Sequence, residues 1–142
     1  MKATLTLILI LSLSVASFSQ GVQTDAEGFQ TFEYQSGDTT YVMKQYFFCM
    51  LKSVTDKPDI PQEEIMAIQS AHLAHLAQMG EDKQICVAGP LGEHPEWAGI
   101  VVFSVPTIDE ARKLMSNDPA VKAGRLAFEI VDWWAAKGTR LF

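Results

Sequence analysis

The segment that most constrains the fold is TYVMKQYFFCMLK, residues 40–52, which is dense in aromatic and other β-favouring residues. Side chains alternate between two faces along a strand. Both faces are largely apolar here, one with Tyr41, Met43, Phe47, Cys49 and Leu51, the other with Val42, Tyr46, Phe48 and Met50. A strand of this kind is typical of the centre of a sheet that is covered on both sides.

Helix-capping residues, breaks at Gly and Pro, and the spacing of apolar residues indicate where the other helices and strands lie. In chain order they are a helix over 61–79 that stops at Gly80, a strand over 84–88, a loop over 89–99, a strand over 100–105, a helix capped by Thr107 that buries Ala111, Leu114 and Met115, a short helix over 119–124 capped by Asp118, and a strand over 126–134. This order predicts an α+β fold of the ferredoxin-like βαββαβ type, an antiparallel sheet with both helices on one face. The open face would be an exposed apolar patch, which a homodimer pairing sheet against sheet would cover.

Residues 1–19 have the pattern of a cleavable signal peptide: Lys2, an apolar run over 5–13 and small residues at 17–19. We expect cleavage before Gln20 and a secreted or periplasmic protein. The alternative, a retained membrane anchor, is disfavoured because the run is too short to span a bilayer. Residues 20–38 show no sustained period and are expected to be a loosely held lead-in, followed by one domain over 39–142.

The charge balance bears on the class of partner. Without Lys2 the mature chain has ten basic and seventeen acidic groups, a net charge near −7, which argues against nucleic acid. No basic cluster or basic amphipathic helix suggests binding to a membrane surface after cleavage.

Cys49 and Cys86 lie in apolar, strand-like runs, so we expect two buried small hydrophobic side chains, with a disulfide as the alternative in an oxidising compartment.

The helix over 61–79 carries a histidine on its apolar face. Helical spacing of about 100° per residue places His72 within the stripe formed by Ile65, Ile68, Leu76 and Met79. Burial disfavours the charged imidazole, and its ring nitrogens need partners. His72 is therefore either a satisfied core residue or a functional one.

Asp118 is the candidate partner of His72. It lies at a junction between two helices, where its carboxylate either caps the short helix or reaches the imidazole. In the second case it fixes the tautomer and stabilises imidazolium, and the pair can act as a general acid or base.

Other residues are candidates for lining a ligand pocket beside this pair. Gly89 and Pro90 end a strand next to the histidine helix and either let a ligand approach the backbone or form a turn. His75, His94 and Trp97 are further ligand-binding candidates, with solvation or packing as the alternative. The two histidines invite a metal interpretation, but no metal is expected because no HExxH or acidic ligand set accompanies them. No cofactor motif is present either.

One ordered set of motifs resembles the YCII-related domain family. It consists of Ala71-His72-Leu73-Ala74, Leu76, Gly80, Ala88-Gly89-Pro90, and Asp118-Pro119 followed by Gly124, within residues 40–134. The resemblance implies a ferredoxin-like dimer similar to the dimeric α/β barrels of muconolactone isomerase, with an active-site His–Asp pair that falls on His72 and Asp118. The family usually has Arg-Pro before the Ala-His pair, where Gln69-Ser70 stand here. Export is also atypical of the family.

Two functions follow as hypotheses. The first is an exported small-molecule enzyme in which His72 is the general acid or base and Asp118 its orienting partner, in an isomerase-, lyase- or hydrolase-like reaction. The second is a non-catalytic dimeric module that binds a small ligand. A structural oligomer without a cleft is the third and weakest alternative.

Overall fold

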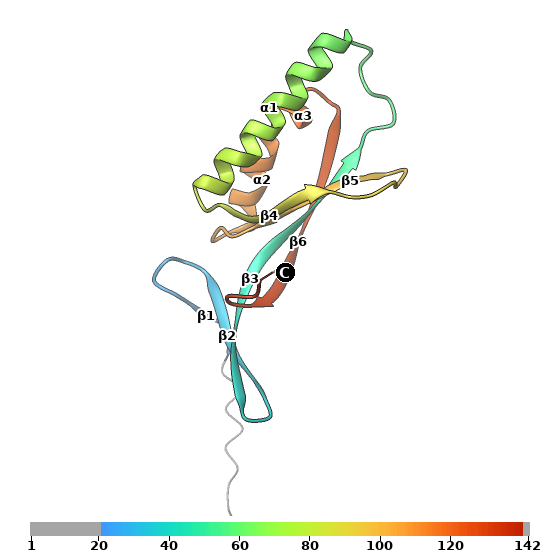
Figure 1. Cartoon of the computed structure of the whole chain (residues 1–142). Coiled ribbons are helices and arrows are strands. Elements are labelled where there is room, and N and C mark those ends of the chain that lie inside the picture. The colour runs from blue at the N-terminus through green and yellow to red at the C-terminus, as the bar shows by residue number, and fades with distance from the viewer. Residues whose placement is uncertain (1–20, 141–142) are drawn as a thin grey trace, which may run out of the picture.

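The computed structural model describes residues 21–140. Its elements are β1 (Gln23–Thr24), β2 (Gln30–Ser36), β3 (Thr39–Ser53), α1 (Gln62–Glu81), β4 (Ile85–Pro90), β5 (Trp97–Phe103), α2 (Ile108–Ser116), α3 (Pro119–Lys122) and β6 (Leu126–Ala136). Figure 1 shows α1 and α2 on one side of the sheet. The signal peptide expected over residues 1–19 lies outside the described residues and stays a prediction.

Strand β3 is the centre of the sheet. One of its edges pairs with β6 over residues 43–53, and the other pairs with β5 over residues 47–52 and with β2 over residues 39–44. Strand β4 adds to the far side of β5, and every pairing is antiparallel. The order β4-β5-β3-β6 with the helices on one face is the ferredoxin-like α+β fold, as the order of elements predicts.

The core lies between the helices and one face of β3. Phe47, Cys49 and Leu51 are buried on that face. They join Met79 of α1, Val101 and Phe103 of β5, Ala111 and Met115 of α2, and Ile130 of β6 in a single cluster. Full burial of each large side chain is worth about 1.5–3 kcal/mol. This cluster fixes α1 and α2 against the sheet.

The other face of β3 is not covered by the described residues, which leaves the open apolar face that the order of elements predicts for a single chain. Tyr46, Phe48 and Met50 are only half-buried there. On the adjacent β6, Val131 and Trp133 are 50% and 43% exposed. Trp133 contacts the rings of Tyr46 and Phe48 at centroid distances of 5.9 and 6.4 Å. We call these five residues the open sheet face.

Within the segment expected to be a loosely held lead-in, residues 23–24 and 30–36 form strands β1 and β2. Strand β2 forms a hairpin with the first part of β3, and the turn contains Gly37 with a φ of 58°. The ring of Phe32 packs at 5.0 Å from that of Trp134 on β6. This segment is ordered by pairing with β3, and no hydrophobic period within it is needed for that.

Helix α1 continues past Gly80, where the sequence analysis expects it to stop. The residue with a left-handed backbone is Lys83, at φ 58°. Its N–H donates to the carbonyl of Gly80 at 3.1 Å, and the N–H of Gln84 donates to that of Met79 at 2.9 Å. These two bonds form a Schellman motif, which stabilises the helix end although a lysine occupies the position that glycine usually takes.

Two further expectations need correction. Strands β4 and β5 extend into the segment expected to be a loop, up to Pro90 and from Trp97 onward. Pro90 is tolerated because β4 is an edge strand. Cys49 is fully buried as expected, but Cys86 is exposed, and both thiols are free. None of the described helices is both long and apolar enough to span a membrane.

The position of Gly80 inside the helix is testable with Gly80→Ala. A Cβ at this residue would meet no atom within 4 Å, and alanine favours the helix more than glycine does. We expect the free energy of unfolding to rise by about 0.5–1 kcal/mol, measured by urea denaturation. If Gly80 ended the helix in a left-handed conformation, the same substitution would lower it.

Candidate active site

A cavity of about 540 Å³ lies between α1 and one end of the sheet. Most of the residues that line it are apolar, and several of them have small side chains or none, which leaves space beneath α1. The lining residues are Leu51, Gln69, His72, Leu73, Leu76, Ala77, Ala88, Gly89, Pro90, Ala98, Gly99 and Leu126. The only polar side chains among them belong to Gln69 and His72. Pockets with this composition are typical of small-molecule sites.

Gly99 has a steric role in the wall of this cavity. A Cβ built on Gly99 would lie 2.7 Å from the carbonyl oxygen of Gly89 on the neighbouring strand. The close approach of β4 to β5 therefore requires glycine here.

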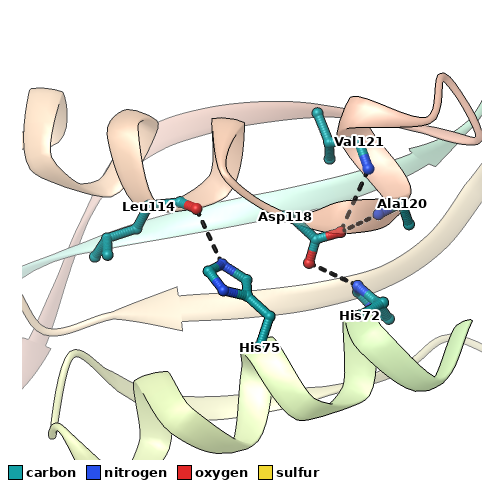
Figure 2. A network of polar contacts seen from close by, with 6 residues as sticks. All are labelled: His72, His75, Leu114, Asp118, Ala120 and Val121. Carbon is teal, nitrogen blue, oxygen red and sulfur yellow. Dashed lines mark hydrogen bonds and ion pairs between the residues drawn. The ribbon is translucent and has the colours of Figure 1, made fainter. Parts of the chain in front are cut away.

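His72 and Asp118 form a direct contact, as Figure 2 shows. His72 Nδ1 lies 2.7 Å from Asp118 Oδ2, and the two side chains are 8% and 0% exposed. Helix α1 brings His72 to the cavity, and the junction between α2 and α3 brings Asp118 to His72. The structure thus joins the two residues that the sequence analysis proposes as a pair.

Asp118 also caps α3, using its other carboxylate oxygen. Oδ1 accepts hydrogen bonds from the backbone N–H groups of Ala120 at 2.8 Å and Val121 at 3.3 Å. From the sequence, the cap and the histidine contact are alternatives, whereas in the structure the carboxylate makes both. Pro119 at the first position of α3 starts that helix, and the cap fixes the rotamer that aims Oδ2 at His72.

The charge state of Asp118 follows from these partners. Burial on its own raises the pKa of this carboxyl. The hydrogen bond and charge of His72, together with the N–H groups of Ala120 and Val121, outweigh burial and hold the pKa below its ordinary value of 3.8. Asp118 is therefore ionised near neutral pH and accepts a hydrogen bond, so that Nδ1 of His72 carries the proton.

The second ring nitrogen of His72 is the one available to a ligand. Among the described residues Nε2 has no hydrogen-bond partner, and no fully buried side-chain nitrogen or oxygen is left without one. Nε2 is thus not fully buried, and His72 lines the cavity. In the neutral imidazole with a protonated Nδ1, this atom is unprotonated and can accept a proton.

Of the five expected ligand-binding residues, only Gly89 and Pro90 line this cavity. His75 instead bonds through Nε2 to the carbonyl of Leu114 at 3.1 Å, which joins α1 to α2 (Figure 2). His94 Nδ1 accepts the N–H groups of Glu96 and Trp97, and its ring stacks on that of Trp97 at 4.2 Å. His94 and Trp97 therefore stabilise the loop between β4 and β5.

The cavity is also lined by one polar and several apolar residues that are not identified from the sequence. Gln69 lies one helical turn before His72, so the spacing of three residues was a usable signal. Leu51, Ala98 and Leu126 come from three different strands, and no local pattern marks them.

Neither thiol resembles an activated nucleophile. Burial, and then the negative charge of Asp118, raise the pKa of Cys49 to about 12. Burial also raises the pKa of the Cys86 thiol. Over the described residues, no group of three or more His, Cys, Asp or Glu side chains is placed to hold a metal ion.

The lowered pKa of Asp118 predicts a pH-dependent contribution to folding. The carboxylate stabilises the folded state fully above the unfolded pKa, near 3.8, and this contribution is lost as the pH falls through the folded pKa. We expect the stability difference between wild type and Asp118→Asn to narrow as the pH falls from about 5 to 2. Urea denaturation over this range measures it, with exposed Asp109→Asn as the control. A difference that does not change with pH would contradict the assignment.

Comparison with known proteins places this geometry in a family. No curated protein matches the chain. A similar solved structure is 5-chloro-2-hydroxyhydroquinone dehydrochlorinase from Burkholderia phenoliruptrix AC1100, in complex with 2,5-dihydroxybenzoquinone. The TM-score is 0.48 at 24% identity, and the match covers 62% of this chain and 92% of that chain. The family model of the YCII-related domain matches residues 47–134, which include both His72 and Asp118. The chain therefore belongs to the YCII-related domain family.

Proposed function

We propose that this protein is an exported small-molecule enzyme in which His72 is a general base and acid and Asp118 orients it. The observation that carries the proposal is a buried His72–Asp118 pair in which His72 lines a cavity of about 540 Å³ and its Nε2 has no partner among the described residues. A perturbed carboxyl beside a histidine in a concave apolar site is a combination typical of acid–base catalysis.

The proposed first step is a proton transfer to Nε2. For a carbon acid, the C–H proton passes to Nε2 while the bonding electron pair moves toward an adjacent carbonyl, which gives an enolate. The buried carboxylate of Asp118 stabilises the imidazolium that forms, because it already accepts the Nδ1 proton. Return of the proton to another atom completes an isomerisation, whereas loss of a β-substituent completes an elimination.

The environment favours this chemistry. The cavity walls are mostly apolar, so bulk water is largely displaced when a ligand binds, and the interaction between imidazolium and carboxylate strengthens. The hydrogen bonds that Asp118 accepts from the N–H groups of Ala120 and Val121 keep its carboxylate in place throughout, so no reorganisation is needed when charge develops.

A binding module without catalysis is the second candidate, since an apolar cavity with few polar groups also suits simple ligand capture. The two functions differ in whether bound molecules exchange protons.

Hydrogen–deuterium exchange of a carbon acid tests the proposal. We expect the wild-type protein to accelerate exchange of the benzylic hydrogens of phenylacetone in D₂O, monitored by proton NMR. His72→Gln should lose about 10²–10⁴-fold of this acceleration. Asp118→Asn should lose about 10-fold or more, because the imidazole is no longer oriented by a carboxylate.

His75→Gln is the matched control, because His75 is on the same helix and bonds to a carbonyl outside the cavity. It should keep the wild-type exchange rate. Exchange that is undiminished in His72→Gln rejects the base assignment. Saturable binding of phenylacetone without any exchange supports the binding module.

We also propose that the open sheet face pairs two copies of the chain in a homodimer. Its half-buried apolar side chains on β3 and exposed ones on β6 form a contiguous patch, and such patches commonly mark interfaces. A two-fold contact between identical sheets would cover it on both copies.

Light scattering after gel filtration tests the dimer with Val131→Glu. Val131 is 50% exposed, so the monomer should tolerate the charge, whereas burying two charges across a two-fold contact is costly. We expect a dimer for wild type and a monomer for the variant. Met66→Glu, at a residue 65% exposed on α1, should stay dimeric. A monomeric wild type contradicts the proposal.

A further inference from the structure

A second, smaller hollow adjoins the cavity that contains His72. It measures about 150 Å³ and is lined by Lys57, Ile65, Ile68, Gln69, Ala120, Arg125 and Leu126. Gln69 and Leu126 line both spaces. The two hollows are therefore neighbours, with Gln69 and Leu126 at their common boundary.

The smaller hollow contains two cationic side chains, in a chain whose net charge is −6. Neither Lys57 nor Arg125 forms a salt bridge among the described residues. Arg125 is half-buried, and its Nη1 donates to the carbonyl of Pro58 at 3.4 Å. Asp56 and Asp59 flank Lys57 along the chain, but neither lines the hollow. Two cations in one concavity without an acidic partner mark a place where an anion is stabilised.

One wall residue of the hollow, the buried Ala120, lies on α3, the short helix that Asp118 caps. The N–H of Ala120 donates to Asp118 Oδ1 at 2.8 Å. The N–H of Arg125 in turn donates to the carbonyl of Ala120 at 2.9 Å. The backbone of α3 thus holds the cationic hollow and the His72–Asp118 pair in a fixed relation.

We propose that Lys57 and Arg125 form an anion subsite and that the ligand is a small monocarboxylic acid. Its carboxylate lies in the hollow, and its apolar body passes between Gln69 and Leu126 into the larger cavity, where it meets His72. The inference rests on the proposed function in that the same ligand presents its reacting atom to His72 Nε2.

The residues that line the two spaces indicate which end of the ligand lies in each space. The larger cavity has no Lys or Arg among its lining residues, and its one imidazole, on His72, is already paired with Asp118, so a carboxylate there would lose hydration without a free ion partner. The guanidinium of Arg125 matches a carboxylate geometrically, and Lys57 adds a second charge. The acidic surface of the chain disfavours ligands with several negative charges.

Two shape-matched probes test the subsite: 3-phenylpropionate and its neutral amide, 3-phenylpropionamide. Dissociation constants come from NMR titration of the wild-type protein at low ionic strength. We expect the acid to bind about tenfold more tightly than the amide, with a ratio that falls as salt is added. Lys57→Gln should reduce the ratio, and the double variant with Arg125→Gln should bring it to about one.

Lys113→Gln is the control, because this cation on α2 lines neither space. Its acid-to-amide ratio should equal that of wild type. The single variant Lys57→Gln keeps the test valid if loss of the Arg125–Pro58 bond perturbs the loop. The proposal is overturned by a ratio near one in wild type, by an unchanged ratio in the double variant, or by failure of the acid to bind.

The result is separable from the exchange experiment, because phenylacetone carries no charge. If the ratio responds to Lys57 and Arg125 while wild type exchanges no protons, the anion subsite stands and the proposed catalysis fails.

Discussion

The buried carboxylate of Asp118 is the interaction on which the arrangement of the site depends. A carboxylate without solvent exposure is costly unless its oxygens are satisfied, and here three donors from two helices satisfy them. The cap on α3 holds the side chain, and the bond to His72 fixes that helix against α1. The same contacts that remove the cost of burial therefore orient the imidazole toward the cavity.

The cavity depends on a different constraint, the distribution of side-chain size over one end of the sheet. Large side chains such as Phe47 and Phe103 fill the space between the helices and the sheet elsewhere. Near α1 the strands instead present Ala88, Ala98 and Gly99, which cannot fill it. Close packing is the rule in protein interiors, so a gap lined by small residues beside a titratable group is informative.

The fold could be predicted from the sequence because its signals are local. The central strand, the Thr107 cap, the Asp118 cap and the break at Pro119 each depend on neighbouring residues, and all are present in the structure. The expected and the observed elements differ where contacts between distant segments override the local sequence pattern. Strand β2 exists because β3 extends far enough to pair with it, and α1 passes Gly80 because Lys83 takes the left-handed position instead.

The sequence by itself determined the order of elements from β3 to β6, the family and the paired residues His72 and Asp118, because helical spacing and capping patterns depend on neighbouring positions. Only the tertiary structure decided which other residues share that site. His75, His94 and Trp97 are near His72 or Gly89 in sequence, yet they do not line the cavity. Leu51 and Leu126 are distant in sequence and do. Strand register and helix packing bring residues into one wall, and both are set by long-range contacts that local pattern does not encode.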